Sequence, residues 1–220
     1  MDIRLTAAPR APAPVPAIAR APAVAAALLA FGVAAAGPLA AQETLRAPEA
    51  FAGIADQAER SAALFAEMGK VLQSPRCLNC HPVTGGPTQG DDMHPHMPPV
   101  IRGEADFGAP GMTCNTCHGA GNVAFTTGEG SIPGHEPWQL APVSMGWQDQ
   151  SLAAICAQIK DPDRNGGRDL EALYEHNAED GLVGWAWHPG EGRAPAPGSQ
   201  EIFGALTRAW IDTGAACPAG

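Results

Sequence analysis

Apolar residues recur at helical spacing in the first part of the chain that follows its Ala- and Pro-rich start. Between residues 47 and 72 they stand three or four positions apart, which places them on one face of a helix. These positions are Ile54, Ala58, Ala62, Phe65, Met68 and Leu72. We therefore predict an amphipathic helix over 47–72 that ends before Pro75.

The same periodicity returns near the end of the chain, where three more helices are predicted. Two of them cover 151–160 and 169–179, and the third begins after Ser199. Ser and Asp residues just before such runs favour helix starts, because their side chains cap free backbone N–H groups. The apolar faces are formed by Leu152, Ile155, Ile159, Leu170, Leu173, Ile202, Phe203, Leu206, Trp210 and Ile211.

The segment between these helical parts has a different character. Of the 65 residues from 82 to 146, 21 are Gly or Pro, and neither a strand nor a helix period is sustained. A stretch this long without secondary structure is uncommon in a compact domain. Something other than regular secondary structure is therefore expected to organise it.

The N-terminus has the pattern of a secretory signal. Basic residues precede the uncharged apolar run 21–36, and small residues follow at Ala40 and Ala41. The run of 16 residues is shorter than the roughly 18 to 20 needed to span a bilayer, so cleavage is favoured over a retained membrane anchor. We predict a signal peptide over 1–41 and a mature chain over 42–220. No cysteine stands at the cleavage site to carry a lipid.

The mature chain is acidic. It keeps ten basic and 22 acidic residues, a formal charge of −12. Such a charge disfavours nucleic acid and anionic lipid as partners, and it suits a protein partner with a basic docking patch. Plain solubility explains the same charge equally well.

Four of the six cysteines form two CxxCH motifs, which are typical of covalent haem attachment. They are Cys77, Cys80 and His81, then Cys114, Cys117 and His118. Two thiols three residues apart on one turn reach the two vinyl groups of a haem, and the next histidine supplies an iron ligand. We therefore predict two covalently bound haem c groups, which would also organise the Gly- and Pro-rich segment.

Three other interpretations of these cysteines are weaker. A zinc ribbon usually has about 15 to 20 residues between its CxxC pairs, and here 33 residues separate Cys80 from Cys114. A thioredoxin-like centre needs a strand, turn and helix around its CxxC. A disulfide framework suits any exported protein. None of the three requires a histidine after both motifs.

The remaining cysteines, Cys156 and Cys217, are predicted to form a disulfide. Each lies in or after a late predicted helix, and the signal peptide indicates an oxidising compartment. The bond would pin the C-terminal helix.

Each iron needs a second axial ligand if the protein is a simple electron carrier. Met145 is the first candidate, for the second haem, because it follows His118 by 27 residues in a loop before a predicted helix. Its alternative is a core methionine beside Trp147. His96 is the candidate for the other haem, with a solvated loop histidine as the alternative. The reserves are His176 first, then His94 and Met112.

Arg102 is a candidate partner for a haem propionate, because a guanidinium group suits a carboxylate. A surface arginine is the alternative. The five tryptophans are expected to pack against haem and core.

Several short stretches resemble a family of exported dihaem cytochromes. They are Cys77-Leu-Asn-Cys-His-Pro, Gln89-Gly-Asp-Asp, Cys114-Asn-Thr-Cys-His-Gly, Gln158-Ile-Lys-Asp-Pro, Asn165-Gly-Gly-Arg, Leu182-Val-Gly-Trp and Trp210-Ile-Asp-Thr-Gly-Ala. Members are often labelled the cytochrome subunit of isoquinoline 1-oxidoreductase-type molybdenum hydroxylases. The resemblance covers nearly all of the mature chain. It implies that electrons leave a molybdenum and iron–sulfur enzyme through this subunit.

Taken together, the sequence predicts a mainly α, loop-rich, cytochrome c-like dihaem fold with little or no β structure. The haem-binding part is expected over about 72–146 and a helical C-terminal part over about 147–220. The predicted function is one-electron transfer in the periplasm, without a stable membrane anchor. A small peroxidase-like haem enzyme or a haem-based ligand sensor is the alternative, and either would need an open iron site.

Overall fold

The computed structural model describes residues 44–220. The predicted signal peptide over 1–41 lies outside the described residues. Between residues 44 and 220, none of the helices is both long enough and apolar enough to cross a membrane.

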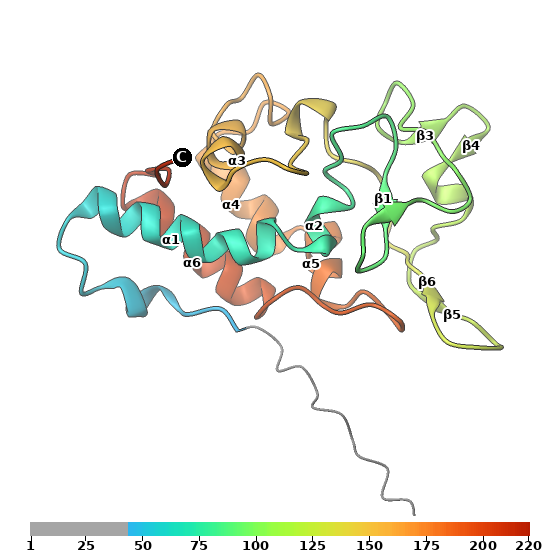
Figure 1. The fold of residues 1–220 in the computed structure, drawn as a ribbon, viewed down its shortest axis with the longest axis horizontal. Coiled ribbons are helices and arrows are strands. Elements are labelled where there is room, and N and C mark those ends of the chain that lie inside the picture. The colour runs from blue at the N-terminus through green and yellow to red at the C-terminus, as the bar shows by residue number, and fades with distance from the viewer. Residues whose placement is uncertain (1–43) are drawn as a thin grey trace, which may run out of the picture. The chain divides into compact units, whose positions relative to one another are not determined.

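Helices dominate the described chain (Figure 1). Its strands have two residues each and pair into three hairpins. The fold is therefore mainly α with little β structure, as predicted. The α-helices are α1 (Gln57–Leu72), α2 (Pro75–Leu78), α3 (Leu152–Ile159), α4 (Leu170–Glu179), α5 (Gly181–Gly184) and α6 (Gln200–Asp212). The 3-10 turns are η1 (Pro48–Phe51), η2 (Cys114–Thr116), η3 (Val143–Met145) and η4 (Trp185–Trp187).

The core forms where α1 and α4 pack against α6 (Figure 1). From α1, Phe65 meets Trp210 of α6 with ring centroids 5.1 Å apart, and both side chains are fully buried. Phe203 of α6 extends the same core and lies 5.8 Å from Trp187. The apolar faces predicted from sequence spacing are therefore the faces that pack together.

The late helices begin where their caps were predicted. Ser151 accepts a hydrogen bond from the backbone N–H of Ala154, and Ser199 accepts one from Ile202. Asp169 caps α4 in the same way. Each cap satisfies an N–H group that has no partner inside its helix.

The first predicted helix ends at Leu72, as predicted, but it begins later than predicted. The predicted span 47–72 divides into η1 and α1, because the backbone is extended at Asp56, whose side chain caps α1. Pro75 does not simply end the helical part, since it opens the short helix α2 that carries Cys77. Proline suits this first helical position because its missing N–H would have no helical partner there.

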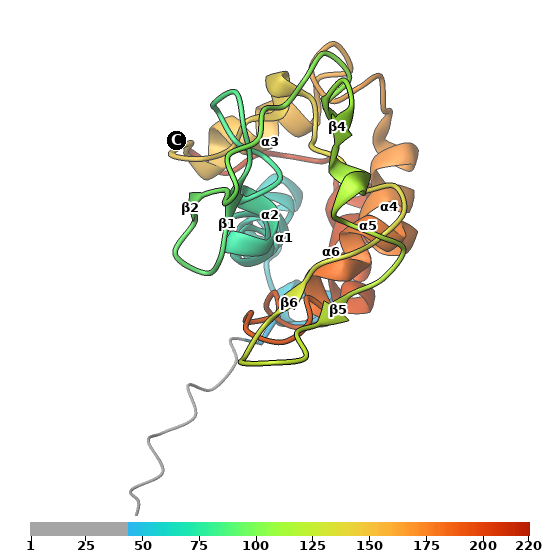
Figure 2. The same cartoon turned by 90° about the vertical axis from the view of Figure 1, so that its right-hand side faces the viewer.

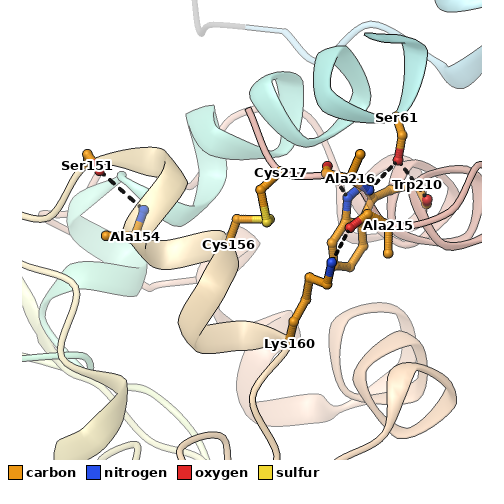
Figure 3. Close-up of a disulfide and its surroundings, with 9 residues drawn as sticks. All are labelled: Ser61, Ser151, Ala154, Cys156, Lys160, Trp210, Ala215, Ala216 and Cys217. Atoms are coloured by element: carbon orange, nitrogen blue, oxygen red, sulfur yellow. Dashed lines mark hydrogen bonds between the residues drawn. A yellow bond between two sulfur atoms is a disulfide. The ribbon is translucent and has the colours of Figure 1, made fainter. Parts of the chain in front are cut away.

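The disulfide predicted between Cys156 and Cys217 is confirmed (Figure 3). The Cα atoms of the two residues are 5.7 Å apart, and the bond joins α3 to the segment after α6. Polar contacts hold the same segment, as Lys160 Nζ donates to the Ala215 carbonyl over 2.7 Å. The Ala216 N–H donates to Ser61 Oγ over 2.8 Å, which ties the tail to α1 as well.

The Gly- and Pro-rich segment carries the three hairpins, which lie away from the helical core (Figures 1 and 2). They pair β1 (Thr88–Gln89) with β2 (His94–Pro95), β3 (Gly108–Ala109) with β4 (Met112–Thr113), and β5 (Val123–Ala124) with β6 (Ser131–Ile132). No hairpin was predicted here, because two-residue strands are too short to show an alternating pattern.

Three arginines organise these loops through carbonyl oxygens, and of these Arg76 and Arg102 are buried and Arg193 is half-buried. Arg76 donates to the Gly90 carbonyl over 3.0 Å, and Arg193 donates to the Ser131 carbonyl over 2.6 Å. Arg102 donates to the Ala141 carbonyl and is paired with Asp106. The long segment is thus ordered in part by the protein's own side chains, whereas the sequence had suggested cofactors alone.

Candidate haem-binding sites

The two CxxCH motifs fold into the same kind of turn. In the first, the N–H groups of Cys80 and His81 both donate to the Cys77 carbonyl, over 3.1 Å each. In the second, the N–H groups of Cys117 and His118 donate to the first cysteine's carbonyl over 3.2 and 3.0 Å. The turn places two thiols and a histidine together, which is the arrangement that haem attachment requires.

Both motif histidines are oriented by a backbone carbonyl. His81 Nδ1 lies 2.8 Å from the Met145 oxygen, and His118 Nδ1 lies 2.7 Å from the Pro133 oxygen. A carbonyl can only accept, so Nδ1 carries the proton and Nε2 keeps a free lone pair. This tautomer is the one that ligates a metal through Nε2.

A tryptophan stacks on each of these imidazoles. Trp147 lies over His81 with ring centroids 3.4 Å apart and planes at 10°. Trp138 lies over His118 at 4.7 Å and 14°. Burial lowers the pKa of His81 to about 3, and it also lowers the pKa of His118. Both rings are therefore fixed and neutral, as ligands must be.

A cavity that is partly open to solvent lies beside the first motif. Its walls include Cys77, Cys80 and His81, together with His176 and Trp185 from the C-terminal part. The site therefore draws on both of the parts into which the sequence was divided.

His176 is held in this wall by its own helix. It lies in α4, and its Nδ1 is 3.0 Å from Asp180 Oδ2, one helical turn further on. The interaction again directs Nδ1 away from any ligand and leaves Nε2 without a hydrogen-bond partner among the described residues. The histidine-to-aspartate spacing of four residues is visible in the sequence, although its role there is not.

His96 lies beside the second motif, where its ring centroid is 6.0 Å from that of His118. Its Nδ1 is 2.8 Å from the Pro98 carbonyl, and its backbone N–H donates to the Pro87 carbonyl over 3.3 Å. The hairpin of β1 and β2 thus presents His96 toward the second motif.

The expected pairing of Met145 and His96 with the two motifs is reversed in the structure. Met145 lines the cavity of the first motif, and its carbonyl holds His81, whereas it was expected beside His118. His96 was expected at the first motif and lies at the second. Distance along the chain was a poor guide because the intervening loops fold back on themselves.

The other candidates lie apart from these positions. Both ring nitrogens of His94 are engaged, Nδ1 with Asp92 at 2.6 Å and Nε2 with Gln89 at 3.1 Å. Met112 is 59% exposed. Neither is positioned as a ligand in this structure.

The motif cysteines fit thioether formation better than thiolate chemistry. Burial raises the pKa of Cys77 to about 12 and that of Cys80 to about 11. A thioredoxin-like centre requires the opposite shift. Between residues 44 and 220, no group of three or more His, Cys, Asp or Glu side chains could hold a metal ion.

Arg102 offers a further test of the fit to haem. It is only 8% exposed, which rules out a surface arginine. Its Nε is buried without a hydrogen-bond partner in the described chain. An unsatisfied buried donor is costly, so a missing acceptor such as a propionate is consistent with this position. Arg102 is not among the residues that line the cavity, so the fit of a haem at the first motif rests on Cys77, Cys80 and His81, which do line it.

Comparison of the chain with protein-family models found no match, and searches among curated proteins and solved structures found none either.

Proposed function

We propose that this protein is a dihaem c-type cytochrome of the periplasm that transfers one electron at a time. The observation that carries the proposal is the repetition of one site. Each CxxCH turn has a histidine whose Nδ1 is bound to a carbonyl and whose face is covered by a tryptophan. A chance pair of CxxCH sequences would not be expected to share these contacts.

In this proposal Cys77, Cys80, Cys114 and Cys117 add across the vinyl groups of two haems, and His81 and His118 supply the proximal nitrogens. Each thiol S–H adds to a C=C bond, so no group leaves. The bound haem supplies a one-electron iron couple, and the protein's residues hold it, shield it and set its potential.

The cellular setting is proposed from two features. The signal-like N-terminus indicates export, and the Cys156–Cys217 disulfide is typical of an oxidising compartment such as the periplasm. The acidic mature chain suits a redox partner with a basic docking patch. On the resemblance, that partner is a molybdenum hydroxylase.

Counting covalent haems tests the attachment directly. The full chain is produced in a bacterial host that attaches haem to c-type cytochromes. The mass of the denatured periplasmic product is then measured by mass spectrometry. We expect the mass of two haems on the wild type and of one haem on each of two double variants, Cys77→Ala/Cys80→Ala and Cys114→Ala/Cys117→Ala. The matched control, Cys156→Ala/Cys217→Ala, should keep both haems. A folded, haem-free wild type would overturn the proposal.

Electron transfer is tested with the holoprotein and a small basic redox protein in a stopped-flow instrument. We expect the oxidised basic protein to oxidise both haems of the reduced holoprotein rapidly. The rate should fall as salt is added, because opposite charges on the two proteins steer their encounter. A salt-independent rate would remove the basic docking patch from the proposal.

A further inference from the structure

We propose that each iron is ligated by two histidines, His81 with His176 and His118 with His96. The proposal rests on the attachment of two haems argued above and names the far ligand of each. It also assigns a different role to Met145, as a residue that positions the proximal histidine of the first haem.

The distance between the two rings supports the pair of His96 and His118. The ring centroids of His96 and His118 are 6.0 Å apart, with planes at 68°. A metal bonded to two imidazole nitrogens at about 2 Å each would hold the ring centroids about 6 Å apart. The two centroids are thus as far apart as an iron and its two bonds would hold them, and the rings meet edge to face rather than in a parallel stack.

The hydrogen bonds of this pair fit the same role. Nδ1 of His118 faces the Pro133 carbonyl at 2.7 Å, and Nδ1 of His96 faces the Pro98 carbonyl at 2.8 Å. In both rings Nε2 has no hydrogen-bond partner within residues 44–220. Metal-ligating histidines almost always donate their other N–H to a carbonyl or carboxylate.

The residues that line the cavity support the pair of His81 and His176. Besides His81, the described residues that line it include two side chains of the kinds that ligate haem iron, Met145 and His176. His176 meets the same condition as His96, because Asp180 engages its Nδ1 at 3.0 Å. The cavity thus brings this oriented imidazole to the site from α4.

The Met145 backbone lies on the Nδ1 side of the proximal ring. Its carbonyl contacts Nδ1 of His81 at 2.8 Å, and Nδ1 points away from an iron bound at Nε2. The Met145 backbone therefore lies behind the proximal ring, close to the stacked Trp147. Met145 as a whole is 6% exposed, and it belongs to the core cluster.

Two histidines on each iron leave no open position for a substrate or gas. The proposal therefore favours an electron carrier over the enzyme and sensor alternatives. It also implies lower reduction potentials than methionine ligation would give.

Spectra of the purified holoprotein test the ligands, and its mass tests the attachment separately. We expect two covalent haems, two low-spin signals of the bis-histidine type in electron paramagnetic resonance, no near-infrared methionine–iron band, and no carbon monoxide binding after reduction. If the mass lacks haem, the proposed function fails. If both haems are present but a methionine–iron band appears or carbon monoxide binds, only the ligand assignment fails.

Variants then test the pairing. His96→Ala and His176→Ala should each keep two covalent haems and convert half of the haem to a high-spin, carbon monoxide-binding form. The matched control is His94→Ala, whose ring nitrogens are both engaged elsewhere, and it should keep the wild-type spectrum. Met145→Leu should also keep two low-spin haems.

A chain with only the first haem, made with Cys114→Ala/Cys117→Ala, makes the test specific. In that background His176→Ala should convert all of the remaining haem to the high-spin, carbon monoxide-binding form. His96→Ala should leave the spectrum of that haem unchanged. The opposite result would overturn the pairing. If an alanine variant fails to fold, His96→Met in the full chain provides the check, because it should introduce a methionine–iron band in one haem. A folded His96→Met protein with an unchanged wild-type spectrum would refute His96 as a ligand.

Discussion

Removal of the Cys156–Cys217 disulfide should destabilise the protein by about 4 kcal/mol. The bond closes a loop with a sequence separation of 61 residues, and for that length the chain-entropy relation gives a loss of about 4 kcal/mol at 25 °C. The loss arises mainly in the unfolded chain, because other contacts still hold the folded tail. Lys160 bonds to Ala215, and Ser61 accepts from Ala216.

The double variant Cys156→Ala/Cys217→Ala is compared with the wild type by urea unfolding, followed by far-ultraviolet circular dichroism on the holoprotein. Single alanine variants are avoided because each would leave a reactive thiol. Lys160→Met serves as a control that removes one tail contact and should cost only about 1 kcal/mol. A double variant that loses less than about 1 kcal/mol would refute the reasoning that the bond acts through the unfolded chain.

Three further predictions concern single residues. Burial acts to raise the pKa of Glu67, but hydrogen bonds from Arg46 and Lys70 hold that pKa below its usual 4.5. Glu67→Gln should therefore lose about 1–3 kcal/mol at pH 7, and the difference from wild type in urea unfolding should shrink as the pH falls below 4.5. Gly103→Ala should lower the thermal midpoint more than Gly111→Ala, because both glycines have positive φ but only at Gly103 would an added Cβ collide with a carbonyl oxygen, that of Gly108. Equal midpoints for these two variants would contradict the close approach. Asp180→Asn removes the carboxylate beside His176 while keeping a capping side chain, so a redox titration should show a higher potential for one haem and an unchanged potential for the other.

Local patterns account for the features that the sequence predicted well. The helices α3, α4 and α6 begin at the Ser and Asp caps and bury the faces that the spacing indicated. The cysteine pattern separated the four motif cysteines, which are unpaired, from the disulfide pair. These properties depend on neighbouring residues or on residue type, so a single sequence contains them.

Local patterns were less informative at the start of the chain. The apolar spacing over 47–72 suggested one helix, although the chain turns between η1 and α1. The extended backbone at Asp56 is compatible with the apolar pattern on either side of it. The spacing rule therefore placed Phe65, Met68 and Leu72 correctly in the core, but it also included Ala58, which is exposed, and it missed the break between the two elements.

The sequence by itself determined the two CxxCH turns, the caps of the late helices, and the set of residues from which ligands could come. Only the tertiary structure decided which of them meet. His81 finds its carbonyl partner 64 residues away, at Met145, and the cavity beside the motif is also lined by a histidine from α4. His96 reaches His118 rather than the first motif because hairpins and buried arginines fold the Gly- and Pro-rich loops. Such loops have no period from which a direction can be inferred, so contacts across them are set by long-range packing and hydrogen bonds.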